Sequence, residues 1–411
     1  MIHGVMRPPG EVLFGCGARA ALPAIVSRFG KAAFVCSDEG VLSQPAVAQT
    51  VEALRRAGIT ATIFGDTAPE LPLHSVSRAL QRTREMPQLD VVIGLGGGSA
   101  IDLAKIVSLL LTHGEPLARF YGESLVPGPC TPVIAVPTTA GTGSEVTPVG
   151  VISDPGRELK VGVSSQFLVP AAAICDPELT TTCPPKVTAY SGIDALAHAV
   201  EAFTAARRLR SFERLNDEVF HGKNELSDGF ALAAVRRIAR TLERAVADGS
   251  DLEARESMLL GSLYAGLAFA AAGTAGAHAL QYAVGAATET PHGLGVGLLL
   301  PFVLSFTRPA CETELESLSA ALGVVDGATD PAGAAIEEVR RLALAVGVPP
   351  TLAGIGVGRA DLPRIAEQAS GVTRLLRNSP RILDPVALLS ILEAAHDGLL
   401  PDGHRAEASA S

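Results

Sequence analysis

A carboxylate and three imidazoles stand out in the apolar C-terminal half of the chain. Asp194 and His198 lie four residues apart among Ala, Leu and Val, so an α-helix would place both on one face, about 6 Å apart along its axis. His278 and His292 also lie in nearly uncharged segments, where a polar side chain needs a partner. One oxygen and three nitrogens suit Fe²⁺ or Zn²⁺ better than Mg²⁺ or Ca²⁺. The four residues are therefore candidate ligands of one divalent metal ion.

His278 and His292 cannot share an ion if they lie on one straight helix. The fourteen positions from one to the other would span about 21 Å in a continuous helix. The chain must therefore turn back, and Gly285 and Thr290-Pro291 are the expected breaks. The alternative is that both histidines are core side chains whose ring nitrogens make ordinary hydrogen bonds.

Two loops rich in Gly and Thr follow apolar strand patterns. Three glycines and a serine follow Asp90–Leu95, and a run of threonines and glycines follows Val133–Pro137. Glycines let the backbone approach a ligand closely, and a following helix N-terminus favours a phosphate. Neither loop has the GxGxxG spacing, so both could be tight turns without a ligand. Two such loops at one edge of a parallel sheet instead favour a nucleotide-binding site. The candidate cofactor-binding residues in these loops are Gly97, Gly98, Ser99, Asp102, Thr138, Thr139 and Thr142.

Asp38 comes after another apolar strand pattern, Ala32–Cys36. Its carboxylate is a candidate acceptor for ribose hydroxyls, and its charge would repel a 2′-phosphate. The residue therefore favours NAD(H) over NADP(H). The alternative is an ordinary turn residue.

The pattern of apolar residues divides the chain into two parts. Strand and helix patterns alternate up to about residue 150, which predicts a parallel sheet with crossover helices. After Pro184-Pro185 the strand patterns stop and helical periodicity continues. We expect an α/β domain over 1–185 and an all-α domain over 186–411, with 207–228 as a charged surface loop.

Composition excludes several classes of protein. The 411 residues include 47% hydrophobic and 18% charged residues, which excludes a disordered chain, and the net charge of −10 without a basic cluster argues against a nucleic-acid partner. The six cysteines show no CxxC spacing and the N-terminus shows no signal-peptide pattern, so we expect reduced thiols and a cytoplasmic location.

One uncharged stretch, Met258–Ala277, is long enough to cross a membrane. It contains Gly and Ala rather than Leu and Ile and leads directly into His278, so we expect a buried helix and no membrane partner. In so apolar a chain, exposed apolar surface favours a homodimer.

Together these motifs resemble the iron-containing (group III) alcohol dehydrogenase family, which has a dehydroquinate-synthase-like fold. The resemblance covers nearly the whole chain. The segments that carry it are Gly96–Ser99 with Asp102, Pro137–Glu145, Asp176–Leu179, Gly192–Ala202, and His278 with Pro291–Gly293. It implies an N-terminal nucleotide domain and a helical metal domain with the active site between them. It also implies metal ligation at Asp194, His198, His278 and His292, and it adds Lys160 to the cofactor contacts.

The function that the resemblance implies is a metal-dependent, NAD(H)-linked alcohol dehydrogenase or aldehyde reductase. The metal would act as a Lewis acid on the oxygen of a small alcohol or aldehyde while the nicotinamide exchanges a hydride with the same carbon. Many members carry a histidine four residues after the third ligand, where this chain has Tyr282. A phenol at this position can relay a proton or only line the pocket.

The substrate is less sharply indicated. A small aldehyde with a phosphonate, sulfonate or carboxylate is one hypothesis, motivated by the cations of the 207–228 segment, namely Lys223, Arg207, Arg208 and Arg210. There are three alternative functions. The first is a lyase that resembles dehydroquinate synthase and uses NAD transiently. The others are a maleylacetate-type enoate reductase and a non-catalytic nucleotide-binding protein.

Overall fold

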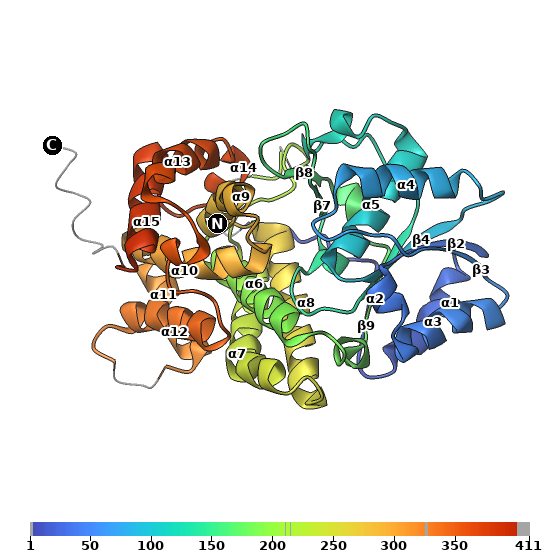
Figure 1. Ribbon diagram of the computed structural model, residues 1–411, viewed down its shortest axis with the longest axis horizontal. Coiled ribbons are helices and arrows are strands. Elements are labelled where there is room, and N and C mark those ends of the chain that lie inside the picture. The colour runs from blue at the N-terminus through green and yellow to red at the C-terminus, as the bar shows by residue number, and fades with distance from the viewer. Residues whose placement is uncertain (1–2, 210, 214, 325–327, 401–411) are drawn as a thin grey trace.

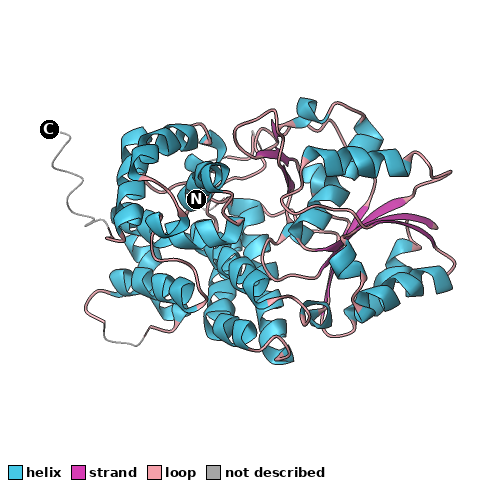
Figure 2. Cartoon of the chain, in the orientation of Figure 1, coloured by secondary structure: helices cyan, strands magenta, loops and turns pink. Residues whose placement is uncertain are grey.

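The computed structural model describes residues 3–209, 211–213, 215–324 and 328–400. Its N-terminal part combines a parallel sheet with helices, and its C-terminal part is helical (Figures 1 and 2). Within the described residues no strand follows β9, which ends at Cys175, and the first long C-terminal helix, α6, begins at Pro185. The predicted fold class, an α/β part followed by an all-α part, is confirmed.

Six strands form one parallel sheet in the order β1-β9-β6-β4-β2-β3. They are β1 (Glu11–Phe14), β2 (Ala32–Cys36), β3 (Thr60–Phe64), β4 (Val91–Gly96), β6 (Val133–Pro137) and β9 (Ala172–Cys175). A small second sheet has the order β5-β8-β7 and consists of β5 (Gly122–Glu123), β7 (Val149–Ile152) and β8 (Val161–Ser164).

Helices cover both faces of the large sheet. The helices of this part are α1 (Leu22–Val26), α2 (Glu39–Leu42), α3 (Pro45–Arg56), α4 (Leu73–Thr83) and α5 (Gly98–His113). Alternate residues of β2 serve the two faces, because Phe34 packs with α4 and α5 whereas Val35 packs with α1 and α3. A sheet covered on both faces explains why its strands are continuously apolar.

The two Gly- and Thr-rich loops start side by side. β4 pairs with β6 in a register that places Gly96 opposite Pro137, so both loops leave the same edge of the sheet. Gly96 has a φ of +157°, and a Cβ on Gly94 would lie 2.7 Å from the Cα of Ile101. The glycines of this strand therefore permit a close contact with α5, which begins at Gly98.

The C-terminal part packs its helices around α6 and α10, which are buried along most of their length. Its helices are α6 (Pro185–Thr204), α7 (Glu225–Ala247), α8 (Leu252–Ala272), α9 (Gly276–Thr288), α10 (His292–Thr307), α11 (Glu312–Leu322), α12 (Pro331–Ala345), α13 (Leu362–Ser370), α14 (Thr373–Leu376) and α15 (Pro385–Asp397). Figure 1 shows this part beside the sheet-containing part.

Three expectations about these helices are wrong in detail. Met258–Ala277 is not one helix, because the chain bends by 101° between α8 and α9, where Gly273 has a φ of +82°. Gly285 lies inside α9 and does not break it. The helix ends at Thr288, and the next residue, Glu289, has a φ of 56°. The 207–228 segment is only partly a surface loop, since His221 and Lys223 are buried and α7 begins at Glu225.

One segment, His292–Ala310, is long and apolar enough to cross a membrane. Its most apolar window is 83% buried inside the protein. The segment is thus covered by neighbouring helices in the way that a core helix is.

Candidate active site

Three helices bring the four candidate metal ligands together. Asp194 and His198 come from one face of α6, His278 from the first turn of α9 and His292 from the first residue of α10. Oδ1 of Asp194 lies 3.8 Å from Nε2 of His198, 3.5 Å from Nε2 of His278 and 3.8 Å from Nε2 of His292. Four ligands at about 2.1 Å from one tetrahedral ion would be about 3.4 Å apart, so these three distances from Asp194 fit a first-row metal.

The burial of these ligand atoms also fits a shared metal ion. Oδ1 of Asp194 and Nε2 of His278 are buried and make no hydrogen bond with the described residues. The ligand atoms of Asp194, His278 and His292 all lie within 4.8 Å of one another. A buried carboxylate oxygen and an imidazole nitrogen aimed at a common point are what a divalent cation satisfies.

The local backbone explains how α10 comes so close to α6. A Cβ on Gly293 would lie 2.1 Å from the carbonyl oxygen of Tyr190 and 3.0 Å from the Cβ of Asp194. Only glycine allows the first turn of α10 to contact α6 in this way. The contact holds His292 next to the carboxylate of Asp194.

Burial and neighbouring charges set the protonation of the cluster. Burial alone would raise the pKa of Asp194, but the imidazoles of His198, His292 and His278 hold that pKa well below its usual range. Burial lowers the pKa of His198 to about 4 and that of His292 to about 3. Burial also acts to lower the pKa of His278, yet Glu201 and Asp194 raise it to about 9. Two neutral imidazoles and an ionised carboxylate are in the state that a metal ion requires.

Glu201, which was not predicted from the sequence, holds His278 in place. Its Oε2 accepts hydrogen bonds from Nδ1 of His278 and from the amide of Ala275, each at 2.7 Å, and its Oε1 accepts one from the amide of Ala277 at 2.7 Å. A proton on Nδ1 leaves Nε2 free for a metal, so Glu201 fixes the tautomer and orientation of His278. Its position three residues after His198, on an apolar helix, was the available signal.

His198 is oriented by packing. Its ring stacks on Phe269 of α8 with the ring centroids 4.3 Å apart, and on His278 with the centroids 4.7 Å apart. The ring is therefore held between two planar groups.

The two Gly- and Thr-rich loops meet at the edge of the sheet. A Cβ on Gly98 would lie 2.5 Å from Cγ2 of Thr142, and one on Gly97 would lie 3.5 Å from Thr139. Thr138 is buried, and its amide donates to the carbonyl of Gly96 at 2.9 Å. Ser99 lies in the first turn of α5. The structure thus places the glycines of one loop against the threonines of the other, beside a helix N-terminus.

Asp38 lies over the glycine loop. Its Oδ1 accepts a hydrogen bond from the amide of Val41 at 2.9 Å and caps α2. Its Oδ2 is 3.8 Å from the position of a Cβ on Gly96. One carboxylate oxygen is therefore used by the helix and the other faces the space above the loop.

Asp102 belongs to a buried network beneath the loops. It accepts a hydrogen bond from the hydroxyl of Ser144 and one from the amide of Val151 at 2.9 Å. The fully buried Lys105 donates to the hydroxyl of Ser144 at 3.0 Å and to the carbonyl of Thr147 at 2.8 Å. This places Asp102 among groups that fasten the second loop to α5.

Burial perturbs the charged members of this network. It raises the pKa of Glu145 to about 7 and lowers that of Lys105 to about 8. Burial also raises the pKa of Asp102 above its usual range. These groups lie on α5 and in the turn at 144–146 that follows the second loop.

The family models match both parts of the chain. A model described as iron-containing alcohol dehydrogenase matches residues 9–177, and one described as the C-terminal part of the Fe-containing alcohol dehydrogenase family matches 188–396. The chain belongs to the iron-containing alcohol dehydrogenase family. It is thus an oxidoreductase that acts on CH–OH groups, and membership implies a divalent metal and a nicotinamide cofactor.

Similar proteins agree with this assignment. Long-chain-alcohol dehydrogenase 1 of Geobacillus thermodenitrificans is 37% identical over 95% of this chain and 96% of its own length. Sulfoacetaldehyde reductase of Bilophila wadsworthia is 31% identical over 93% of this chain and 97% of its own length. The crystal structure of a 1,3-propanediol oxidoreductase superposes with a TM-score of 0.88 at 32% identity, over 96% of this chain and all of that one.

In this member of the iron-containing alcohol dehydrogenase family, the candidate metal ligand His292 lines a cleft of about 490 Å³. Tyr282 and Lys160 line it, and the rings of Tyr282 and His292 are 6.1 Å apart between centroids. Lys160 forms an ion pair with Glu70, and burial lowers its pKa to about 8. Burial raises the pKa of Tyr282 above its usual range. The structure therefore brings both residues to the side of the metal ligands.

The cations of the 207–228 segment that the structure describes do not line this cleft. Lys223 pairs with Asp228 at 2.7 Å, Arg208 pairs with Glu218, and Arg207 lies 3.3 Å from Glu225. Arg210 lies outside the described residues. Carboxylates within the segment thus occupy its described cations.

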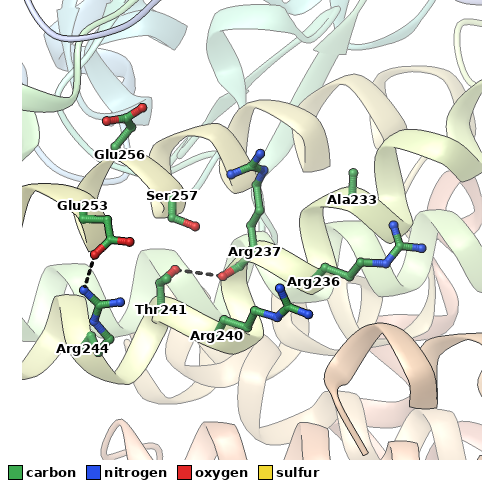
Figure 3. Close-up of a pocket in the computed structure, with 9 residues that line it drawn as sticks. All are labelled: Ala233, Arg236, Arg237, Arg240, Thr241, Arg244, Glu253, Glu256 and Ser257. Atoms are coloured by element: carbon green, nitrogen blue, oxygen red, sulfur yellow. Dashed lines mark hydrogen bonds and ion pairs between the residues drawn. The ribbon is translucent and has the colours of Figure 1, made fainter.

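A pocket of about 570 Å³ lies elsewhere, between α7 and α8 (Figure 3). Figure 3 shows Arg236, Arg237 and Arg240 on one helix, with Arg244 paired to Glu253 across the groove. None of the candidate site residues lines it. Of these two pockets, the smaller cleft beside His292 is the one that candidate site residues line.

Proposed function

We propose that the protein is a metal-dependent, NAD(H)-linked alcohol dehydrogenase that reduces a small aldehyde or oxidises the matching alcohol. The observation that carries this proposal is the convergence of Asp194, His198, His278 and His292, with ligand atoms 3.5 to 3.8 Å from Oδ1 of Asp194. The relatives named for alcohol oxidation and for sulfoacetaldehyde reduction support the same class of reaction.

The chain's own residues have distinct roles in this proposal. Asp194, His198, His278 and His292 would hold one Fe²⁺ or Zn²⁺, and Glu201 would keep the proton of His278 on Nδ1. The bound metal would supply Lewis acidity at the substrate oxygen, and the nicotinamide would supply or accept the hydride. Tyr282 lines the cleft beside His292 and would hold the proton that the substrate oxygen gains or loses.

The cofactor would extend from the loops to the cleft. Gly97, Gly98 and Ser99 would approach the phosphates, with Thr138, Thr139 and Thr142 contacting the cofactor from the second loop. Asp38 would bind the ribose and disfavour NADP(H), and Lys160 would contact the cofactor from the cleft side. Asp102 would fasten the second of these loops to α5.

The remaining proposals concern the whole molecule. We keep 1–185 as the nucleotide domain and 186–411 as the metal domain. All six cysteines are free thiols, which supports a cytoplasmic location. A homodimer also remains a prediction, testable by sedimentation.

The function is tested by following NADH absorbance with a panel of short aldehydes, before and after removal of the metal. We expect oxidation of one NADH per aldehyde reduced, lost on chelation. A lyase that uses NAD transiently would show no net NADH oxidation. An enoate reductase would oxidise NADH with maleylacetate, but none of the aldehydes would support NADH oxidation. Either result would replace the proposed function.

A further inference from the structure

The groove between α7 and α8 is lined by four arginines and by none of the candidate site residues (Figure 3). Arg236, Arg240 and Arg244 lie four residues apart on α7, so they follow one face of the helix at steps of about 6 Å along its axis. Arg237 lies next to this row, and Ser257 of α8 lines the groove from the other helix. A row of cations on one helix is thus joined by a hydroxyl group on the other.

The carboxylates of the groove lie toward one end of it. Arg244 pairs with Glu253 at 2.9 Å, near the turn that joins the two helices. Figure 3 shows Glu256 toward this end as well, away from the guanidinium group of Arg236. Among the residues that the structure describes, no carboxylate oxygen lies within 4.0 Å of a guanidinium nitrogen of Arg236 or Arg240. These two arginines therefore keep an uncompensated charge.

The two uncompensated guanidinium groups favour phosphate as a ligand. Arg236 and Arg240 repel each other because they lie one turn apart on a helix, and a bound anion would relieve this repulsion. A guanidinium group donates two parallel hydrogen bonds to a phosphate, so two such groups can hold two phosphates. The half-buried Ser257 offers a further donor, because its hydroxyl makes no hydrogen bond with the described residues.

The size of the groove and the charge of the chain favour a small molecule. Ligand pockets of proteins usually measure about 300 to 1,000 Å³, and the volume of this groove is about 570 Å³. The net charge of −10 opposes the approach of the whole chain to an anionic membrane or to nucleic acid. A small anion responds mainly to charges within about 8 Å, and in this groove most of these belong to arginines.

We propose that the groove between α7 and α8 binds a small anion that carries two phosphate groups. Arg236 and Arg240 would each bind one phosphate, and Arg237 and Ser257 would add donors beside them. Arg244 would stay paired with Glu253 and close that end of the groove. This site is separate from the metal ligands and the nucleotide loops, and it does not depend on the proposed function.

The test is a calorimetric titration of the metal-loaded protein with fructose 1,6-bisphosphate, with saturating NADH present to fill the nucleotide site. Glucose 6-phosphate, which has one phosphate on a frame of similar size, is titrated for comparison. We expect one bisphosphate per chain, bound at least about tenfold more tightly than the monophosphate. Arg236→Gln and Arg240→Gln should each weaken bisphosphate binding about 10- to 100-fold, because each removes charged hydrogen-bond donors.

The matched control is Arg55→Gln, which removes an exposed cation from α3 and should leave the affinity unchanged. The absence of bisphosphate binding by the wild type overturns the proposal, and so does an equal loss of affinity in Arg55→Gln or an equal affinity for the two sugar phosphates. Sedimentation with phosphatidylserine vesicles tests a lipid headgroup as the source of phosphate. Retention on these vesicles without binding of the bisphosphate also overturns the proposal. None of these measurements requires turnover, so the proposed function stands or falls separately.

Discussion

Replacement of Glu201 by glutamine tests whether an outer carboxylate prepares His278 for a metal ion. The carboxylate accepts three hydrogen bonds of 2.7 Å, from Nδ1 of His278 and from the amides of Ala275 and Ala277. A glutamine has one oxygen and one NH₂ group, so its NH₂ must face a backbone N–H in either orientation. When the NH₂ replaces Oε2 it also donates to Nδ1 of His278, which moves the proton to Nε2 on the metal side.

The size of the effect follows from these contacts. Loss of such an outer partner weakens metal binding about 10- to 100-fold, or about 1.4 to 2.8 kcal/mol. The buried donors left facing the NH₂ group should lower the free energy of unfolding by about 2 kcal/mol in addition. The kcat at saturating metal should recover more fully than the affinity, because the four ligands themselves remain.

The assay is a calorimetric titration of metal-free protein with Zn²⁺, repeated anaerobically with Fe²⁺, together with a thermal melt. Glu316→Gln is the control, since this exposed residue of α11 makes the same chemical change away from the site. An unchanged metal affinity in Glu201→Gln would refute the role of Glu201, even if the melt shows a loss of stability.

Three further predictions concern the cofactor loops and the network beneath them. Asp38→Gly should raise the ratio of kcat/KM with NADPH to that with NADH at least about tenfold, because it removes a negative charge from the site of the 2′-phosphate; an unchanged ratio in cofactor kinetics would contradict this. Gly98→Ala should raise the KM for NADH, because its Cβ would lie 2.5 Å from Thr142, whereas Gly229→Ala, with nothing within 4 Å, should leave the KM unchanged; equal KM values would rule the clash out. Burial raises the pKa of Glu145 from 4.5 to about 7, so the native state keeps a proton that the unfolded state loses, and stability should fall by up to about 3 kcal/mol as the pH rises from about 4.5 to 7. Denaturant titrations across this range should show a smaller fall for Glu145→Gln, and an identical pH profile would exclude the role of this carboxyl group.

The candidate metal site could be predicted from the sequence because polar residues in apolar segments have few possible roles. Asp194 and His198 on an apolar helix predicted a shared face, and histidines in uncharged segments pointed to one polar site. The strands before the two loops were recognisable because both faces of their sheet are covered, which makes them continuously apolar. These local patterns were sufficient to predict the fold class.

Features that depend on tertiary contacts were not visible in the sequence. Glycine is required at position 273 by its φ of +82° and by the approach of Asn378, whose Nδ2 would lie 2.3 Å from a Cβ there. Asn378 is more than a hundred positions away in the sequence. Short strands such as β5 and β8 carry too few residues to show a period.

The central claim is that Asp194, His198, His278 and His292 hold one divalent metal that turnover requires. The direct measurement is elemental analysis of anaerobically purified protein, combined with NADH oxidation before chelation, after chelation and after return of Fe²⁺ or Zn²⁺. We expect about one iron or zinc per chain, loss of turnover when the metal is removed and recovery when it is returned. Full aldehyde-dependent turnover by protein that holds only trace metal would contradict it.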